Sequence, residues 1–139
     1  MGSMETVTVP RPLVRQILDH ARSSPAVEVC GLVGARAGVP ATVYPVANVA
    51  AEAARRFHMD PREQIAAMRA LREGGETLFA IYHSHPQGPP RPSATDLREA
   101  AYPEVLYLII HLASDPPLHG FRLGAGRFEP VPLTAAPSA

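Results

Sequence analysis

Residues 82–97 read Tyr-His-Ser-His-Pro-Gln-Gly-Pro-Pro-Arg-Pro-Ser-Ala-Thr-Asp-Leu and follow an apolar run, residues 77–82, that is typical of a buried strand. Because residues two apart on a strand point to the same face, we expect the side chains of His83 and His85 to project together. Asp96 follows after a loop rich in proline and glycine that can fold back over the strand end. The segment therefore predicts a site built from two imidazoles and a carboxylate.

This combination of side chains indicates a metal ion. Two histidines, one carboxylate and a fourth position open to water are the pattern of a catalytic zinc rather than of a closed structural one. Such a metal lowers the pKa of its water to around 7 and polarises a substrate carbonyl. We therefore expect His83, His85 and Asp96 to bind Zn²⁺. For the two histidines alone, a hydrogen-bonded pair at a strand end would be an equally good interpretation.

A hydrolytic zinc site also needs a base, and Glu28 is the candidate because it stands among apolar residues that would otherwise belong to a core. If the strand expected over residues 28–35 lies beside the strand over residues 77–83, the Glu28 carboxylate can reach the attacking water. Ser93 could donate its hydroxyl to the oxyanion that forms when the carbonyl is attacked. The simpler interpretations are an edge-strand charge for Glu28 and a helix capping box for Ser93 and Asp96.

Cys30 is the single cysteine of the chain, so an internal disulfide is excluded and a reducing compartment is favoured. It would share a strand face with Glu28, but a small buried core thiol is the better interpretation. The remaining histidines lack partners at metal-ligand spacing and are expected to be surface or core residues: His20, His58, His111 and His119.

The rest of the chain predicts a mixture of strands and helices. We expect strands over residues 6–9, 28–35, 41–49, 77–83 and 105–112, helices over 12–23, 61–73 and 93–101, and a last hairpin formed by 118–123 and 127–133. Asp60 is the expected N-cap of the second helix, with Glu63 completing a capping box. Ile65, Met68 and Leu71 are expected to form its buried stripe.

The composition describes one domain with zero net charge, which does not exclude a local basic patch. The 139 residues suit a single core, expected over residues 5–133, with residues 1–3 a cloning remnant and residues 134–139 a flexible tail. Thirteen lysine plus arginine residues balance thirteen aspartate plus glutamate residues, so neither nucleic acid nor an anionic membrane is favoured as a partner. With no apolar segment near the roughly 20 residues of a membrane span and no visible signal peptide, we expect a cytoplasmic protein.

The candidate residues together resemble a known motif. Glu28, followed after a long gap by His83-x-His85-Pro86-x6-Ser93-x2-Asp96, is similar to the JAMM motif of the MPN-plus metalloproteases. The resemblance covers nearly the whole domain and implies an α/β (α+β) fold, a cytidine-deaminase-like mixed β-sheet flanked by three helices. It implies that His83, His85 and Asp96 bind zinc. It also implies that Glu28 is the general base and then the proton donor, and that Ser93 stabilises the tetrahedral intermediate.

By this resemblance the chain is a zinc metallopeptidase that hydrolyses the amide or isopeptide bond after the C-terminal glycine of a ubiquitin-like or sulfur-carrier protein. The short spacings around the motif resemble those of compact prokaryotic members, some of which release cysteine or another adduct from a sulfur carrier. A Gly-Gly tail could add as an extended strand to a sheet edge, with Gly31 leaving space near the metal. The oligomeric state is not predicted.

Three other functions are weighed against this one. A non-catalytic interaction module of the same fold would have no affinity for zinc. A DNA-associated role like that of RadC-type proteins would require salt-dependent DNA binding, and the zero net charge weighs against it. A zinc nucleoside deaminase would need paired cysteine ligands, which one cysteine cannot supply.

Overall fold

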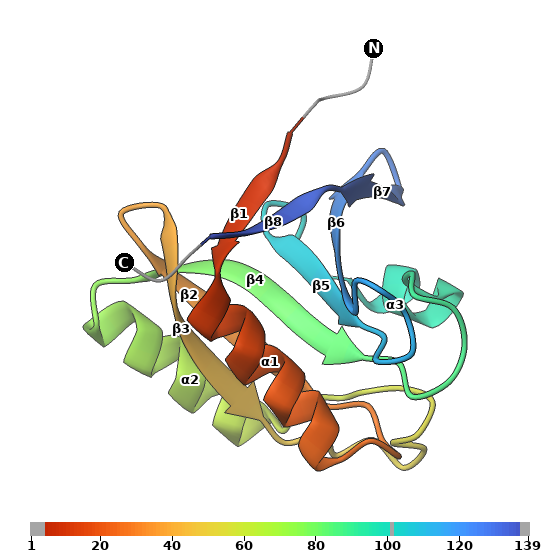
Figure 1. Ribbon diagram of the computed structural model, residues 1–139. Coiled ribbons are helices and arrows are strands. Elements are labelled where there is room, and N and C mark those ends of the chain that lie inside the picture. Colours follow the sequence, from red (N-terminus) through yellow and green to blue (C-terminus); the bar gives the residue numbers. More distant parts are fainter. Residues whose placement is uncertain (1–4, 101, 137–139) are drawn as a thin grey trace.

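The computed structural model describes residues 5–100 and 102–136, and a six-stranded mixed sheet runs through their centre (Figure 1). Its strand order is β3-β2-β4-β5-β6-β7, with β4 and β5 parallel and the other neighbours antiparallel. β1 and β8 form a separate two-stranded parallel sheet. The strands are β1 (Val7–Pro10), β2 (Cys30–Arg36), β3 (Val39–Val46), β4 (Thr77–Ser84), β5 (Leu106–Ile110), β6 (Leu118–Gly124), β7 (Arg127–Val131) and β8 (Leu133–Ala136).

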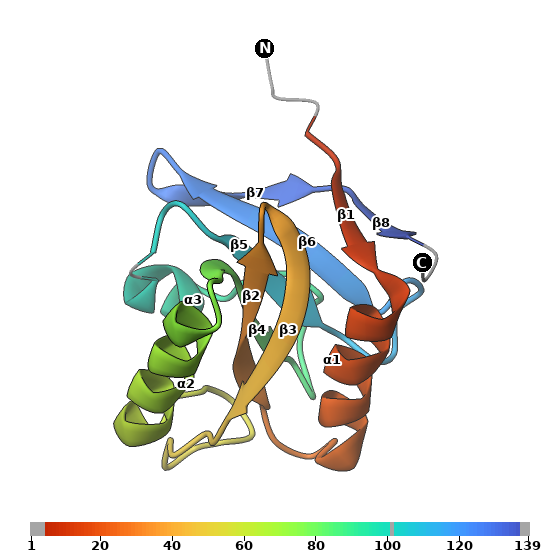
Figure 2. The same ribbon diagram turned by 90° about the vertical axis from the view of Figure 1, so that its left-hand side faces the viewer.

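Helices cover both faces of the sheet. α1 (Arg11–Ser23) lies on one face, and α2 (Pro61–Glu73) and α3 (Ala94–Glu99) lie on the other, as Figure 2 shows. This arrangement confirms the predicted mixed sheet flanked by three helices. Within the described residues, no helix is long and apolar enough to cross a membrane.

The central strands are buried on both faces, because successive side chains serve two separate cores. Tyr82 and Leu108 point into the core beneath α1, whereas Ile81 and Ile109 belong to the core on the opposite face of the sheet. All five residues of β5 are buried. The predicted double-sided burial of this strand is therefore confirmed.

The pairing of β2 with β4 brings the two halves of the sequence motif together. Cys30 lies opposite His83 in an antiparallel register. β2 begins at Cys30, so Glu28 stands just before the strand and not at its head as expected. Cys30 is fully buried, and burial raises the pKa of its thiol to about 12, which suits a core residue.

α2 differs from its prediction in two side chains. Asp60 caps the helix as expected, but the Glu63 carboxylate accepts a hydrogen bond from the Ala47 backbone N–H at 2.9 Å and completes no capping box. Ile65 is 61% exposed, whereas Leu71 is buried. Six positions place Ile65 about 120° around the helix from Leu71, on the solvent side. The prediction that Ile65 is part of the buried stripe was therefore wrong.

The chain ends also differ from expectation. β7 ends at Val131, and residues 133–136 form β8, which pairs with β1 from Val7↔Leu133 to Pro10↔Ala136. This strand occupies part of the segment that the sequence favoured as a flexible tail, because pairing with β1 depends on residues more than a hundred positions away. Residues 1–3 and 137–139 lie outside the described residues.

Gly31 makes room for an aromatic ring and not for a substrate. It lies opposite Tyr82, and a Cβ at Gly31 would come within 2.5 Å of the Tyr82 ring. That ring is fully buried, and its hydroxyl lies 2.7 Å from His20 Nδ1 on α1. Because this is the face opposite His83, the expectation that Gly31 leaves space near the metal was wrong.

The replacement Gly31→Ala should lower the free energy of unfolding by about 1–3 kcal/mol, because the Tyr82 ring is held in place and cannot yield. Chemical denaturation measures the loss. Gly124→Ala is the matched control, since a Cβ there meets no atom within 4 Å, and its effect should stay within about 0.5 kcal/mol. Equal stabilities of the two variants would contradict this packing.

Candidate metal centre

Four titratable side chains converge at one end of β4. Glu28, His83, His85 and Asp96 each offer one ligand atom, and these atoms lie within 4.8 Å of one another. His83 lies in β4 and His85 directly follows that strand, whereas Asp96 comes from the first turn of α3 and Glu28 from the segment before β2. The spatial grouping is the one that the sequence predicts, whereas the roles of these residues stay predictions.

The three candidate ligand atoms form a nearly equilateral triangle. Nε2 of His83 lies 3.1 Å from Nε2 of His85, and each of these nitrogens lies 3.2 Å from Oδ2 of Asp96. A tetrahedral zinc with ligands at 2.0–2.1 Å sets its ligand atoms about 3.3 Å apart. The triangle thus has the dimensions that such an ion requires.

The donor and acceptor roles of the groups around the triangle also favour a cation at its centre. Nδ1 of His85 donates to the Pro89 carbonyl at 3.0 Å, because a carbonyl can only accept, so a neutral His85 turns the lone pair of Nε2 toward Asp96. Two acceptors then face each other, and a cation between them would stabilise both. Among the described residues, the buried atoms Glu28 Oε1 and His83 Nδ1 have no hydrogen-bond partner.

Burial and neighbouring charges set the protonation of these groups. Burial lowers the pKa of His83, which favours the neutral form that a metal requires. Burial alone would raise the pKa of Asp96, but when a proton occupies the place between them, the histidines donate to its carboxylate and hold that pKa well below its usual range. Burial raises the pKa of Glu28 to about 7, so this carboxyl can take and give a proton near neutral pH.

Ser93 forms the capping box that the sequence allows. Its Oγ accepts a hydrogen bond from the Asp96 N–H at 3.0 Å, and its own N–H donates to Asp96 Oδ2 at 2.8 Å. The cap therefore orients the same carboxylate oxygen that faces the histidines. The hydroxyl proton of Ser93 is not used in this cap, so it can still donate to a substrate.

Two neighbours of the site were missed from the sequence. Ser84 fixes the segment that carries Glu28 by two hydrogen bonds to Val29. Its Oγ accepts one from the Val29 N–H at 2.9 Å, and its own N–H donates one to the Val29 carbonyl at 3.0 Å. Phe57 stacks on the His83 ring with centroids 4.4 Å apart. The available signal for Ser84 was a small polar residue between the two histidines whose side chain points to the opposite face of the strand, whereas no local pattern marks Phe57.

The four other histidines lie outside the cluster, in agreement with the sequence interpretation. His20 contacts Tyr82, and Nε2 of His119 lies 3.0 Å from Ser114 Oγ. His58 lines the cavity described next.

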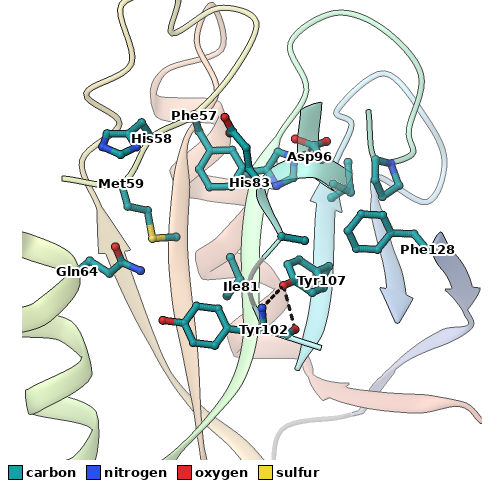
Figure 3. A pocket seen from close by; sticks show the side chains of 14 residues that line it. Phe57, His58, Met59, Gln64, Ile81, His83, Asp96, Tyr102, Tyr107 and Phe128 are labelled. Carbon is teal, nitrogen blue, oxygen red and sulfur yellow. Dashed lines mark hydrogen bonds and ion pairs between the residues drawn. The ribbon is translucent and has the colours of Figure 1, made fainter. Parts of the chain in front are cut away.

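An apolar cavity of about 420 Å³ adjoins the cluster (Figure 3). His83 and Asp96 border it at the candidate metal centre, and α2, α3 and β7 contribute further walls. Most of its wall is apolar or aromatic and includes Phe57, Met59, Ile81, Tyr107, Ile109 and Phe128. Such a cavity beside convergent polar groups is a typical place for part of a substrate.

Several known proteins are similar to this chain, and they agree on one family. The family described as prokaryotic homologs of the JAB domain matches residues 10–123. A desampylase of Haloferax volcanii is 39% identical over 67% of this chain and 71% of its own length. A probable TtuB-protein conjugate cleaving protease of Thermus thermophilus is 38% identical over 73% of this chain and 67% of its own length. A CysO-cysteine peptidase of Mycobacterium bovis is 31% identical over 94% of this chain and 92% of its own length.

Solved structures show the same fold. The solution structure of a Desulfitobacterium hafniense protein superposes with a TM-score of 0.82 at 33% identity and covers 95% of this chain and 94% of its own. A JAB1/MPN domain protein from Archaeoglobus fulgidus, at 18% identity, superposes with a TM-score of 0.56 over 96% of this chain and all of its own.

If the triangle of ligand atoms holds a metal, each of its members should be needed for binding. We expect the purified protein to bind one divalent ion, and His83→Ala and Asp96→Ala to lose it, as measured by elemental analysis after dialysis. His58→Ala is the matched control, because His58 lines the cavity but is not in the cluster, and it should keep the ion. Metal retained by both ligand variants would contradict the assignment.

Proposed function

The chain belongs to the family of prokaryotic JAB-domain proteins, and on that premise we propose that it is a zinc-dependent peptidase. Its substrate is the amide bond after the C-terminal glycine of a ubiquitin-like or sulfur-carrier protein. The names of its relatives, a desampylase, a conjugate cleaving protease and a CysO-cysteine peptidase, support this class of substrate. The observation that carries the proposal is the convergence of Glu28 with His83, His85 and Asp96. A cytoplasmic location stays a prediction.

Zinc is the metal that fits the donor set best, because two imidazoles and one carboxylate leave a fourth position for water. When bound by His83, His85 and Asp96, it would supply a Lewis acid and a nucleophile at neutral pH. Nδ1 of His85 carries the proton and donates a hydrogen bond to the Pro89 carbonyl, so the lone pair of Nε2 is free to bind the ion. The Ser93 cap holds the Asp96 carboxylate in place.

Glu28 performs the proton transfers in this proposal. Its buried Oε1 has no hydrogen-bond partner among the described residues, so a water molecule at the centre can use it. The carboxylate accepts the proton of the attacking water and then gives it to the leaving amine. A pKa raised to about 7 by burial suits both steps. The hydroxyl of Ser93 donates to the oxyanion that forms at the substrate carbonyl.

The surroundings of the site favour a substrate tail with small residues at the scissile bond. The two histidines are buried and Asp96 is half-buried, so a peptide backbone must come close to reach them. A pair of glycines has no side chains to prevent that approach. The apolar cavity beside His83 offers contact surface to the residues before the glycines.

The direct test is incubation of the zinc-loaded protein with ubiquitin-fold carriers that are extended by cysteine or a short peptide after Gly-Gly, followed by mass spectrometry. We expect cleavage after the last glycine. A carrier in which that glycine is replaced by a bulky residue is the matched control and should resist cleavage. No cleavage of any carrier, or equal cleavage of the control, would contradict the proposed substrate class.

The variant Glu28→Gln should keep zinc and lose hydrolysis, because glutamine cannot accept the proton while the three ligands are unchanged. Hydrolysis is measured as cleavage of the extended carrier, and zinc content is measured by elemental analysis. Full turnover by this variant would remove Glu28 from the role of base.

The variant Ser93→Ala should keep the metal but lose about 2.7–4 kcal/mol of transition-state stabilisation, which is about a hundredfold to a thousandfold in kcat. The matched control is Thr95→Ala, since the Thr95 hydroxyl accepts from Arg98 at 3.1 Å on the same helix and takes no part in the cap. Equal kcat values for the two variants would show that Ser93 acts only as a helix cap.

A further inference from the structure

One side-chain amide joins the candidate base to the loop that covers the metal centre. Nδ2 of Asn48 donates to the Glu28 carbonyl at 2.8 Å and to the Arg56 carbonyl at 3.0 Å. Its Oδ1 accepts from the backbone N–H groups of Ala50 and His58, both at 3.0 Å. These four bonds use both donors and both acceptor lone pairs of the amide.

The Glu28 backbone depends on this loop because it lies outside the sheet. β2 begins at Cys30, so neither the N–H nor the carbonyl of Glu28 is held by strand pairing. The N–H donates to the Ala53 carbonyl at 2.7 Å, and the carbonyl accepts from Asn48. Residues 48–58 therefore position the Glu28 backbone together with Ser84, which bonds to the neighbouring Val29.

The same loop delivers a second group to the centre. Phe57 stands between Arg56 and His58, both of which are bonded to the Asn48 amide, and its ring stacks on His83. Movement of the loop would therefore displace the base and uncover a candidate ligand together. Asn48 is not one of the four residues of the candidate metal centre and does not line the cavity, so it acts only through Glu28 and the loop.

We propose that Asn48 is a positioning residue of the hydrolytic reaction, an inference that rests on the proposed function. One donor bonds to the Glu28 carbonyl and so holds the Glu28 carboxylate at the place where it takes the proton of the attacking water. The other donor and the acceptor oxygen order the loop that carries Phe57. Aspartate has the same shape and keeps the acceptor but lacks both donors. Asn48→Asp therefore removes the bonds to the Glu28 and Arg56 carbonyls but keeps those from the Ala50 and His58 N–H groups.

The test compares Asn48→Asp and Asn48→Ala with Thr42→Val as the matched control. Thr42 donates to the buried carboxylate of Glu76 at 2.6 Å, a bond at the far end of the sheet, so its loss should lower the thermal midpoint without changing kcat. Both Asn48 variants should lose about a hundredfold in kcat, with KM and zinc content within twofold of the parent protein. Wild-type kcat in both Asn48 variants would overturn the inference.

Hydrogen exchange gives a readout that is independent of activity. The amides of Ala50 and His58 should be protected in the parent protein and in Asn48→Asp, and exposed in Asn48→Ala. If Asn48→Ala does not fold, Asn48→Asp alone decides the question. Protected loop amides with reduced kcat support positioning of Glu28, and protected amides with wild-type kcat overturn it.

A double variant identifies the group through which Asn48 acts. Adding Asn48→Asp to Glu28→Gln should leave the residual rate unchanged, because the base that Asn48 positions is already gone. Losses that multiply would overturn the inference while leaving the proposed function intact. A fully active Glu28→Gln would instead remove the proposed base, and so the failure of one idea is distinguished from the failure of the other.

Discussion

The antiparallel pairing of β2 with β4 sets Cys30 opposite His83, and every group of the candidate centre is placed relative to that pair. Glu28 stands two residues before Cys30, so it reaches the end of β4, where the histidines lie. Ser84 strengthens this junction from the opposite face by bonding to both backbone groups of Val29. A one-residue slip of β2 would turn its side chains to the other face of the sheet and move Glu28 out of reach.

The same junction brings buried acceptor groups together, an arrangement that a cation would stabilise. His83 and His85 are buried, and their Nε2 atoms face an ionised Asp96 while the Glu28 carboxyl lies close by. Buried charges of one sign are unfavourable unless they are paired or bind a metal. A divalent ion would offset the carboxylate charge and fill the triangle of ligand atoms. The strand pairing that stabilises the sheet therefore also assembles the groups that would hold the ion.

Local patterns predict much of this arrangement, and long-range contacts account for what they miss. The two-residue spacing of His83 and His85 and the capping box of Ser93 with Asp96 depend on neighbours in the sequence, so they could be read directly. The pairing of β8 with β1 and the ring of Tyr82 above Gly31 depend on packing between distant segments. The four bonds of Asn48 likewise appear only once its loop is folded.

The most direct test of the metal centre is X-ray absorption spectroscopy at the zinc edge of the loaded protein. The structure predicts two imidazole nitrogens and oxygen ligands at about 2.0–2.2 Å, with no sulfur, because the Cys30 thiol is buried beside the Val46 carbonyl. A zinc–sulfur distance of about 2.3 Å, or a spectrum without imidazole scattering, would contradict a centre formed by His83, His85 and Asp96.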